Sequence, residues 1–287
     1  MSKKTIAVTG KNGQLGSELY KLHTDYVNYD WQFTDSSELD LKNVDAINAW
    51  FEKIRPDYFI NCAAYTAVDK AEEDKENAYT INATAVKIIA ENCKKFNTIL
   101  IQVSTDYVFN GNGQQPYTTD EPTEPINYYG FSKRAGERFA LENNPDTIVL
   151  RTAWVYSSYG KNFVKTMLHL MSNRDEINVV NDQLGSPTYA HDLARAILDI
   201  IGTKDIHPGV YHFTNEGVIS WFDFAVAIRD LSNLNCKVNP IPASQFPTPA
   251  KRPAYSVLDK SSLQKTFGIE LKEWTHSLKE CLSLLGA

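Results

Sequence analysis

A tyrosine and a lysine four residues apart, Tyr129 and Lys133, stand in the stretch NYYGFSKRAGE, residues 127–137. Residues at this spacing share one face of a helix. A nearby ammonium stabilises a phenolate and moves the pKa of the phenol down from about 10, toward the pH where proton transfer is most effective. Because the chain has 15 tyrosines, about one such pair is expected by chance. The interpretation of this pair therefore depends on its surroundings.

Two hydroxyl side chains, Ser104 and Thr105, stand at the expected carboxyl end of a strand in IQVSTDYVFNG. In an open α/β sheet, ligands bind at that edge. A hydroxyl there could hydrogen-bond a substrate oxygen beside Tyr129, which gives two donors at one carbonyl where negative charge develops. The alternative is that both hydroxyls cap the turn that follows the strand.

Three glycines, Gly10, Gly13 and Gly16, separate the first expected strand from the first expected helix in TGKNGQLG. The first gap is one residue longer than in G-x-G-x-x-G, but the physical effect is the same. Without side chains the backbone can approach a pyrophosphate, and the helix N-terminus offers it unpaired N–H groups. The pattern predicts a dinucleotide site; the alternative is a turn, a cap and a packing glycine without a ligand.

An acidic residue at the end of the second strand normally holds the ribose hydroxyls of adenosine. Asp35 is the candidate, and Asp30 competes with it. A carboxylate favours NADH because it repels a 2′-phosphate, whereas Ser36 and Ser37 could donate hydrogen bonds to that phosphate. The choice between NADPH and NADH therefore stays open, and Asp35 could also be an ordinary turn residue.

The elements that must position these residues alternate between short apolar runs and helical patterns, which favours a parallel sheet. Strands are expected in KTIAVTG, WQFT, DYFINCAA, TILIQVST and TIVLRTAW, and helices over 14–22, 43–55, 77–96 and 127–142. The predicted class is α/β, a doubly wound parallel sheet of the Rossmann type with a smaller, loop-rich α/β substrate-binding lobe. Prolines and glycines after about residue 153 predict an NAD(P)-binding domain over 1–152 and about 190–215. The nucleotide-sugar-binding lobe takes about 153–189 and 216–287.

The composition limits the partners. A net charge of -6 and a pI near 5.6 disfavour a nucleic-acid partner, so a small molecule is expected. The four cysteines contain no CxxC pair, which argues against a zinc site or a disulfide framework and fits a reducing compartment. The apolar run in MSKKTIAVTG is too short for a signal peptide, and no window approaches a membrane span. We expect a cytoplasmic protein without a membrane partner.

The order of the TGxxGxxG loop, the strand-end Ser/Thr and YxxxK resembles the extended short-chain dehydrogenase/reductase family. Further blocks cover most of the chain and resemble the dTDP-4-dehydrorhamnose reductases within that family. These blocks are GKNGQLG, CAAYTAVDKAE, INATAV, STDYVFNG, YGFSKRAGE, RTAWVY, GKNFVKTM, VNDQLGSPT and KRPAYSVLD.

The resemblance implies NADPH- or NADH-dependent reduction of the C4 keto group of dTDP-4-dehydro-6-deoxy-L-mannose to dTDP-L-rhamnose. In that reaction Thr105 would polarise the carbonyl, Tyr129 would protonate its oxygen, and Lys133 would hold the ribose and tune Tyr129. The implied cofactor site comprises Gly10, Asn12, Gly13, Gln14, Leu15, Gly16, Asp35, Asp40, Leu41, Ala63, Ala64, Tyr65, Asn82, Tyr129 and Lys133. The implied substrate site comprises Val68, Asp69, Ser104, Tyr107, Trp154, Gln183 and Arg252.

Four of the implied substrate residues also have an ordinary structural explanation. Trp154 could wall the sugar or simply pack in the core. Arg252 could pair a diphosphate or be solvated, and Gln183 could read a hydroxyl or the thymine or stand in a turn. The stretch that Asp69 begins, DKAEEDKEN, reads mostly as a solvated helix face.

Some members of the resembled family hold magnesium between subunits with a cluster of carboxylates. No such cluster is apparent in the sequence, and His191 is interpreted as structural rather than as a ligand. We therefore expect no metal site and a monomer or homodimer.

Two other functions compete with the reductase. A nucleotide-sugar dehydratase usually carries Asp-Glu after the strand-end Thr, but here Asp106 and Tyr107 follow Thr105. An epimerase would retain NAD without net consumption of reduced cofactor. A non-catalytic regulatory subunit, resembling that of methionine adenosyltransferase, could keep the cofactor loop without turnover.

Overall fold

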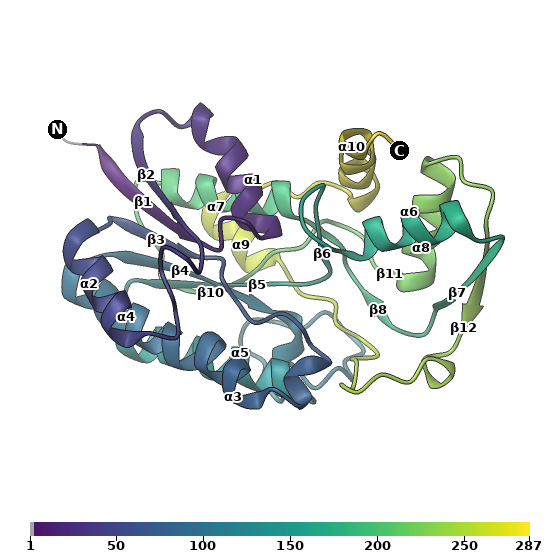
Figure 1. The fold of residues 1–287 in the computed structure, drawn as a ribbon, viewed down its shortest axis with the longest axis horizontal. Helices are drawn as coiled ribbons and strands as arrows, with labels where there is room; N and C mark the ends of the chain where they lie inside the picture. Colours follow the sequence, from purple (N-terminus) through teal and green to yellow (C-terminus); the bar gives the residue numbers. More distant parts are fainter. Residues whose placement is uncertain (1–2) are drawn as a thin grey trace.

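A six-stranded parallel sheet forms the centre of the computed structural model, which describes residues 3–287 (Figure 1). The strand order is β10-β5-β4-β3-β1-β2. The strands are β1 (Lys4–Thr9), β2 (Tyr29–Thr34), β3 (Tyr58–Asn61), β4 (Ile99–Thr105), β5 (Thr147–Thr152) and β10 (Gly209–His212). The order reverses direction between β1 and β3, which is where a doubly wound sheet binds its ligand. The predicted α/β class is confirmed.

Helices cover both faces of this sheet because side chains along each strand alternate between them. Ile6 and Val8 of β1 share a core with α1 (Gln14–Leu22), α7 (Ala190–Gly202) and α9 (Ser261–Phe267). Ala7, between them, belongs to the opposite core with α2 (Val44–Ile54), α4 (Ala85–Phe96) and α5 (Tyr128–Asn143). The predicted helices over 14–22, 43–55 and 127–142 are thus confirmed to within a residue or two.

The helix predicted over 77–96 is continuous but not uniform. It begins as α3 (Lys75–Tyr79), passes through a π-helical turn at Thr80–Thr84 and continues as α4. Such turns are rare and often mark functional positions. This one contains Asn82, whose side chain is almost fully buried.

The remaining elements gather beside the sheet, at the opposite end of the molecule from α2 (Figure 1). They are β6 (Val155–Tyr156), α6 (Phe163–Asn173), β7 (Glu176–Val180), β8 (Leu184–Gly185), β9 (Thr188–Tyr189), β11 (Ile219–Ser220), α8 (Trp221–Leu231), β12 (Lys237–Ile241) and α10 (Trp274–Leu285). The strands pair as β12 with β7, β11 with β8 and β6 with β9. A separate core that includes Val164, Ile177, Phe224 and Leu278 joins these elements, which we call the lobe.

The chain leaves the sheet after β5, returns for α7 and β10, and then enters the lobe again. Leu263 and Ile269, within the region assigned to the lobe from sequence, pack in the core on the α1 side of the sheet. The division into two domains stays a prediction.

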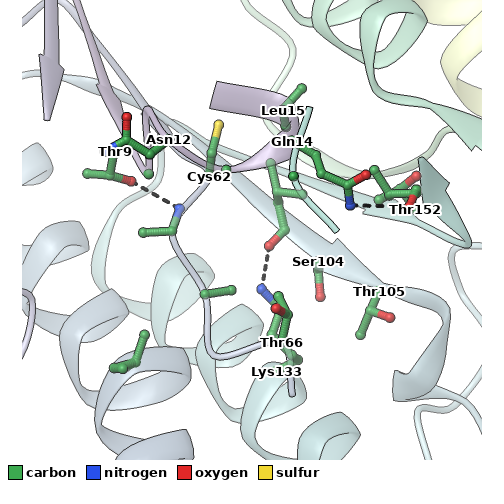
Figure 2. Close-up of a pocket in the computed structure, with 18 of the residues that line it drawn as sticks. Thr9, Asn12, Gln14, Leu15, Cys62, Thr66, Ser104, Thr105, Lys133 and Thr152 are labelled. Atoms are coloured by element: carbon green, nitrogen blue, oxygen red, sulfur yellow. Dashed lines mark hydrogen bonds between the residues drawn. The ribbon is translucent and has the colours of Figure 1, made fainter. Parts of the chain in front are cut away.

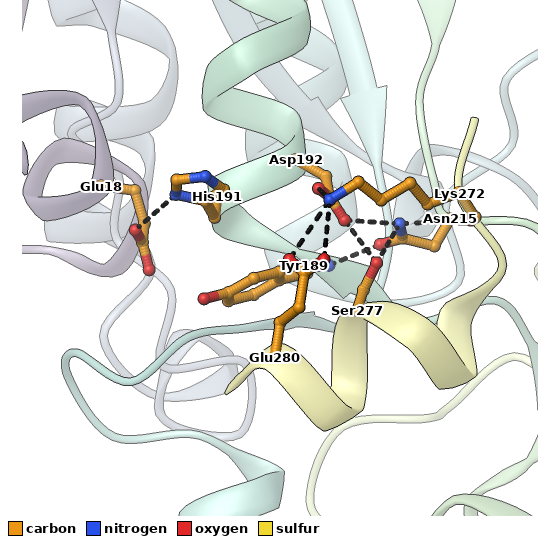
Figure 3. Close-up of polar contacts among 8 residues, drawn as sticks. All are labelled: Glu18, Tyr189, His191, Asp192, Asn215, Lys272, Ser277 and Glu280. Atoms are coloured by element: carbon orange, nitrogen blue, oxygen red, sulfur yellow. Dashed lines mark hydrogen bonds and ion pairs between the residues drawn. The ribbon is translucent and has the colours of Figure 1, made fainter. Parts of the chain in front are cut away.

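Figure 3 shows how the C-terminal helix α10 is joined to the start of α7. The buried carboxylate of Asp192 accepts hydrogen bonds from Ser277 of α10 and from Asn215 Nδ2 at 2.8 Å. Lys272 Nζ lies 3.1 Å from the other carboxylate oxygen. Because buried charges persist when paired and hydrogen-bonded, this cluster is a structural connection.

Within residues 3–287, no helix is long and apolar enough to cross a membrane.

Candidate active site

A cavity of about 1010 Å³ lies along the carboxyl edge of the sheet. Parallel register places Thr9 of β1 beside Asn61 of β3, and Thr105 of β4 beside Thr152 of β5, so these strand ends meet at one edge. The cavity extends from the end of β2, lined by Asp35, to the neighbouring ends of β4 and β5 and the residues that follow these two strands. We call these regions the β2 end and the β5 end.

The glycine loop lies between these ends, and its shape requires glycine at two positions. Gly10 has φ +69°, and a Cβ at Gly16 would lie 2.2 Å from the Gly10 carbonyl oxygen. Helix α1 therefore starts very close to the loop. Gly13 is the N-cap of α1 and has no side chain to occupy the first N–H groups of the helix. Free N–H groups at a helix N-terminus bind phosphate, so the loop fits a dinucleotide pyrophosphate.

Asp35 at the β2 end is held by several donors. Its carboxylate accepts hydrogen bonds from Ser37 Oγ at 2.6 Å, the Ser37 N–H at 2.9 Å and Asn12 Nδ2 at 2.7 Å. The two hydrogen bonds from Ser37 lower the pKa of Asp35. Asp30 is exposed near the start of β2 and does not line the cavity. Of the two acidic candidates, Asp35 is therefore the one that a cofactor in the cavity can meet.

Asn82 shapes the loop after β3 instead of lining the cavity. Its amide accepts from the Tyr65 N–H at 2.8 Å and donates to the Tyr65 carbonyl at 3.0 Å. The Tyr65 hydroxyl donates to Asp74, away from the cavity. The cavity wall here is formed by Ala63, Ala64 and Thr66. A second hydrogen bond fixes this loop, from the Ala63 N–H to Thr9 Oγ1 (Figure 2).

Helix α5 brings Tyr129 and Lys133 to the cavity because two glycines let it pack closely. A Cβ at Gly130 would lie 2.1 Å from the Tyr107 carbonyl oxygen, and a Cβ at Gly136 would lie 2.0 Å from the Asn82 carbonyl oxygen. Glycine inside a helix costs about 1 kcal/mol relative to alanine. Here this cost is offset by the contact that places the Tyr129 ring against the Tyr107 ring, with centroids 5.6 Å apart.

Lys133 is buried beneath Ser104 and Thr105, and its Nζ donates to the Val103 carbonyl at 2.7 Å (Figure 2). Burial lowers the pKa of Lys133 to about 8, although Glu137 and Cys62 raise it. Burial raises the pKa of Tyr129, and the Thr105 hydroxyl opposes that rise. Within residues 3–287, Lys133 makes its hydrogen bond to the backbone and not to Tyr129. The tuning of Tyr129 by Lys133 stays a prediction.

Thr105 combines two proposed roles. Its Oγ1 accepts from the Tyr107 N–H at 3.2 Å, so it caps the turn Asp106–Val108, and it also lines the cavity. The same hydroxyl donates to Asp106 Oδ1 at 2.9 Å. Burial raises the pKa of Asp106 to about 6. Ser104 lines the cavity too, and its buried Oγ has no hydrogen-bond partner among the described residues.

Two stacked tryptophans form a wall at the β5 end. Trp154 stacks on Trp221 with centroids 3.6 Å apart and an angle of 11° between the rings. Trp154 has φ +50°, a strained backbone for a bulky side chain, and a Cβ at Gly185 would lie 2.6 Å from its ring. Strain of this kind is typical of functional sites. Trp221 was not predicted, although it lies within the Ser220–Asp223 capping box, which marks the start of a helix.

Arg252, Asp69 and Gln183 do not line the cavity. Arg252 Nη2 pairs with Asp69 Oδ2 at 2.7 Å, and the positive charge of Arg252 lowers the pKa of the neighbouring Tyr107 against a larger rise caused by burial. Gln183 is half-buried in the loop before β8.

The predicted site residues therefore divide into two groups. Those that line the cavity are Gly10, Asn12, Gly13, Gln14, Leu15, Asp35, Asp40, Leu41, Ala63, Ala64, Val68, Ser104, Thr105, Tyr107, Tyr129, Lys133 and Trp154. Those outside its lining are Gly16, Tyr65, Asn82, Asp69, Gln183 and Arg252.

No group of three or more His, Cys, Asp or Glu side chains is placed to hold a metal ion in the described part of the chain. His191 Nδ1 lies 3.2 Å from Glu18 Oε2, a contact between α7 and α1 (Figure 3).

Comparison with known proteins gives consistent matches. The family model described as RmlD substrate binding domain matches residues 4–286. The chain is 42% identical to the dTDP-4-dehydrorhamnose reductase of Aggregatibacter actinomycetemcomitans, over 96% of this chain and 97% of that protein. Among solved structures, the Clostridium acetobutylicum dTDP-4-dehydrorhamnose reductase superposes with a TM-score of 0.95 at 44% identity, covering 99% of this chain and 100% of the other. The Bacillus anthracis dTDP-4-dehydrorhamnose reductase in complex with NADP superposes with a TM-score of 0.94 at 38% identity, covering 98% of this chain and 99% of the other.

Proposed function

We propose that this chain, which belongs to the RmlD substrate binding domain family, is an NAD(P)H-dependent dTDP-4-dehydrorhamnose reductase. It reduces the C4 keto group of dTDP-4-dehydro-6-deoxy-L-mannose and yields dTDP-L-rhamnose. The observation that carries this proposal is that Thr105, Tyr129 and Lys133 line the same cavity as the glycine loop.

The cofactor would be held along the first strands. NADPH or NADH supplies the hydride when bound. Gly10, Gly13 and the start of α1 would receive its pyrophosphate, because no side chain blocks the backbone there. Asp35 would accept hydrogen bonds from the adenosine ribose. Ser37, which is hydrogen-bonded to Asp35, and Lys42, which also lines the cavity, would meet a 2′-phosphate. This end of the cavity has groups for either cofactor.

The proton comes from Tyr129. Because burial raises the pKa of this phenol, it is protonated at neutral pH, which is the state that a general acid requires. Tyr129 would give its proton to the C4 oxygen as the keto group is reduced. With a pKa of about 8, Lys133 is mostly an ammonium at pH 7 and would hold the nicotinamide ribose. Trp154 and Trp221 would form the wall beside the sugar and help to exclude water.

Several narrower assignments belong to the same proposal. Arg252 and Asp69 lie next to Tyr107 and would meet the diphosphate only after their ion pair opens. We place the enzyme in the cytoplasm, where the four free cysteines would stay reduced, as a monomer or homodimer.

The direct test is to incubate the protein with dTDP-4-dehydrorhamnose and either NADPH or NADH, following the loss of reduced-nicotinamide absorbance and identifying the product by NMR. We expect one equivalent of cofactor to be consumed for each dTDP-L-rhamnose formed. Substrate conversion without net cofactor consumption would indicate an epimerase. Binding of cofactor without any conversion would favour the regulatory-subunit alternative.

A further inference from the structure

Asp106 is a buried carboxyl group at the β5 end of the cavity that the mechanism above does not use. It follows Thr105 directly, and its Oδ2 atom has no hydrogen-bond partner among the described residues. It also forms no ion pair within residues 3–287. A buried carboxylate without a cation or a full set of donors is costly, so its presence beside a reacting hydroxyl requires an explanation.

The hydrogen bonds of Thr105 show what Asp106 does to it. A threonine hydroxyl has one proton and two lone pairs. Its proton is donated to Asp106 Oδ1 at 2.9 Å, and one lone pair accepts the Tyr107 N–H at 3.2 Å. In this arrangement Thr105 has no proton left for a substrate carbonyl.

We infer that Asp106 is a positioning residue that sets the direction of the Thr105 hydrogen bond, an inference that rests on the proposed function. When Asp106 is ionised, Thr105 donates to its carboxylate and cannot donate to the C4 carbonyl oxygen. When Asp106 is protonated, its carboxyl proton is donated to Thr105 Oγ1, and the threonine proton turns to the carbonyl oxygen. Thr105 and Tyr129 then both donate to the oxygen on which negative charge develops.

The surroundings of Asp106 favour its protonated form. Burial raises its pKa to about 6, while the hydroxyls of Thr105 and Ser256 and the N–H groups of Asp106 and Tyr107 oppose that rise. The titratable groups that face it are Tyr107 on its own turn and Tyr129 on α5; both are neutral phenols with raised pKa values. Arg252, on the loop that also carries Ser256, acts on Tyr107. The switch in hydrogen-bond direction therefore falls within the range of an ordinary enzyme assay.

Substrate binding strengthens this effect. A nucleotide sugar brings the negative charge of its diphosphate into the cavity and displaces water, and both changes disfavour an ionised carboxylate. In the ternary complex we expect the Asp106 pKa to lie above its value in the free enzyme. The direction of the pH dependence follows from this. The kcat should be high at pH values below the Asp106 pKa and should fall as the pH rises through it.

The test is the pH dependence of kcat in wild type and in Asp106→Asn. Removing one donor to an oxyanion costs roughly 10²–10³ in rate. We therefore expect the wild-type kcat to fall by about tenfold or more between about pH 6 and about pH 8. The side-chain amide introduced by Asp106→Asn can donate to Thr105 Oγ1 at every pH, so kcat of this variant should vary by less than about threefold over that range.

A double-mutant cycle tests whether Asp106 acts through Thr105. Thr105→Val removes the hydroxyl while preserving the side-chain shape, and its low residual rate, measured in single turnovers, should lack the wild-type slope. Adding Asp106→Asn to Thr105→Val should leave that profile unchanged. Asp175→Asn, at an exposed position before β7, should keep the wild-type slope and serves as the matched control.

Two outcomes would overturn the inference: a wild-type slope retained in Asp106→Asn, or an effect of Asp106→Asn that persists without the Thr105 hydroxyl. Cofactor affinity, measured by fluorescence titration, checks that each variant is folded. If Asp106→Asn does not fold, the pH profiles of wild type and Thr105→Val are compared instead. A dependence of the rate on pH that is retained in Thr105→Val rules out a switch in the direction of the Thr105 hydrogen bond. Absence of any turnover by the wild type contradicts the proposed function, whereas an active wild type with an unchanged Asp106→Asn profile contradicts only this inference.

Discussion

At the β2 end of the cavity, Asp35 is partly solvated and accepts hydrogen bonds from Ser37 and Asn12, which lower its pKa. At the β5 end, Asp106 is buried, its Oδ2 has no hydrogen-bond partner within residues 3–287, and burial raises its pKa to about 6. Both carboxyl groups follow strands of the same parallel sheet and line the same cavity. The number of donors and the access of water, not the residue type, therefore decide the protonation state.

The two ends of the cavity therefore have different proposed functions. The β2 end is wet and charged, and it recognises a cofactor by fixed hydrogen bonds. The β5 end is dry and aromatic, and burial there raises the pKa values of Asp106 and Tyr129 because it disfavours their charged forms. Substitutions at the β2 end should change only the affinity for the cofactor. Substitutions at the β5 end should change the rate of the chemical step or the affinity for the nucleotide sugar.

The largest effect is expected for Tyr129→Phe, which keeps the ring and removes the proton donor. Turnover should fall by about 10²–10⁴, the usual contribution of general acid catalysis. Steady-state kinetics measure this loss, and fluorescence titration should give a Kd for NADPH within about threefold of wild type. A variant that keeps a tenth of the wild-type rate would exclude Tyr129 as the acid.

Lys133→Met should have the next largest effect. Lys133 would contribute both to cofactor binding and to the chemical step, because it would hold the nicotinamide ribose near Tyr129. We expect kcat/KM to fall by about 10–100-fold and the cofactor Kd to rise. Burial lowers the pKa of Lys133 to about 8, so its ammonium is present below that pH and is lost above it. The wild-type rate should accordingly decline as the pH rises through about 8. Cofactor affinity unchanged in Lys133→Met would contradict the assignment to the ribose.

Trp221→Ala tests the wall of the β5 end. The variant removes the ring that stacks on Trp154, and an aromatic pair contributes about 0.5–1.5 kcal/mol beyond its buried area. The KM for the nucleotide sugar should rise about tenfold, with the Kd for NADPH unchanged. An equal loss of affinity for both ligands would show that Trp221 supports the whole fold and not the wall.

Asp35→Asn should have the smallest effect, and only at the β2 end. Removing the charge weakens a hydrogen bond to the ribose and also removes repulsion of a 2′-phosphate. The Kd for NADH should rise about threefold to fivefold, and the ratio of NADH to NADPH affinity should shift toward NADPH. Calorimetric titration with both cofactors measures this ratio. Equal changes in the Kd for NADH and for NADPH would show that Asp35 does not determine the preference between the two cofactors.

The cofactor half was largely predictable because its signals are local. The end of a strand, three glycines and the start of a helix follow one another within TGKNGQLG, and two of the glycines, Gly10 and Gly16, have a steric reason in the structure. The parallel sheet then brings the strand ends of Thr9 and Thr105 to the same edge. Local pattern and simple topology were sufficient there.

The β5 end was less predictable because its contacts join distant segments. No local sequence pattern predicts that Trp154 stacks on Trp221. Nor does one predict that Arg252 forms an ion pair with Asp69 outside the cavity lining. Asn82 shows a different limit. The resemblance implied a cofactor contact, but the Asn82 amide hydrogen-bonds the Tyr65 backbone and supports the loop instead of lining the cavity. Such indirect roles depend on side-chain direction, which a motif does not specify.

The late return of the chain to the sheet has a consequence for protein synthesis. Strand β10 pairs with β5, yet residues 153–208 separate them in the chain. While the ribosome makes that segment, the β5 edge has no partner, and unpaired edges of apolar strands are prone to aggregation. The emerging sheet is therefore an incomplete folding unit until the first part of the lobe has been translated. Gene fragments that end near residue 152 would encode that vulnerable intermediate and not a cofactor-binding module.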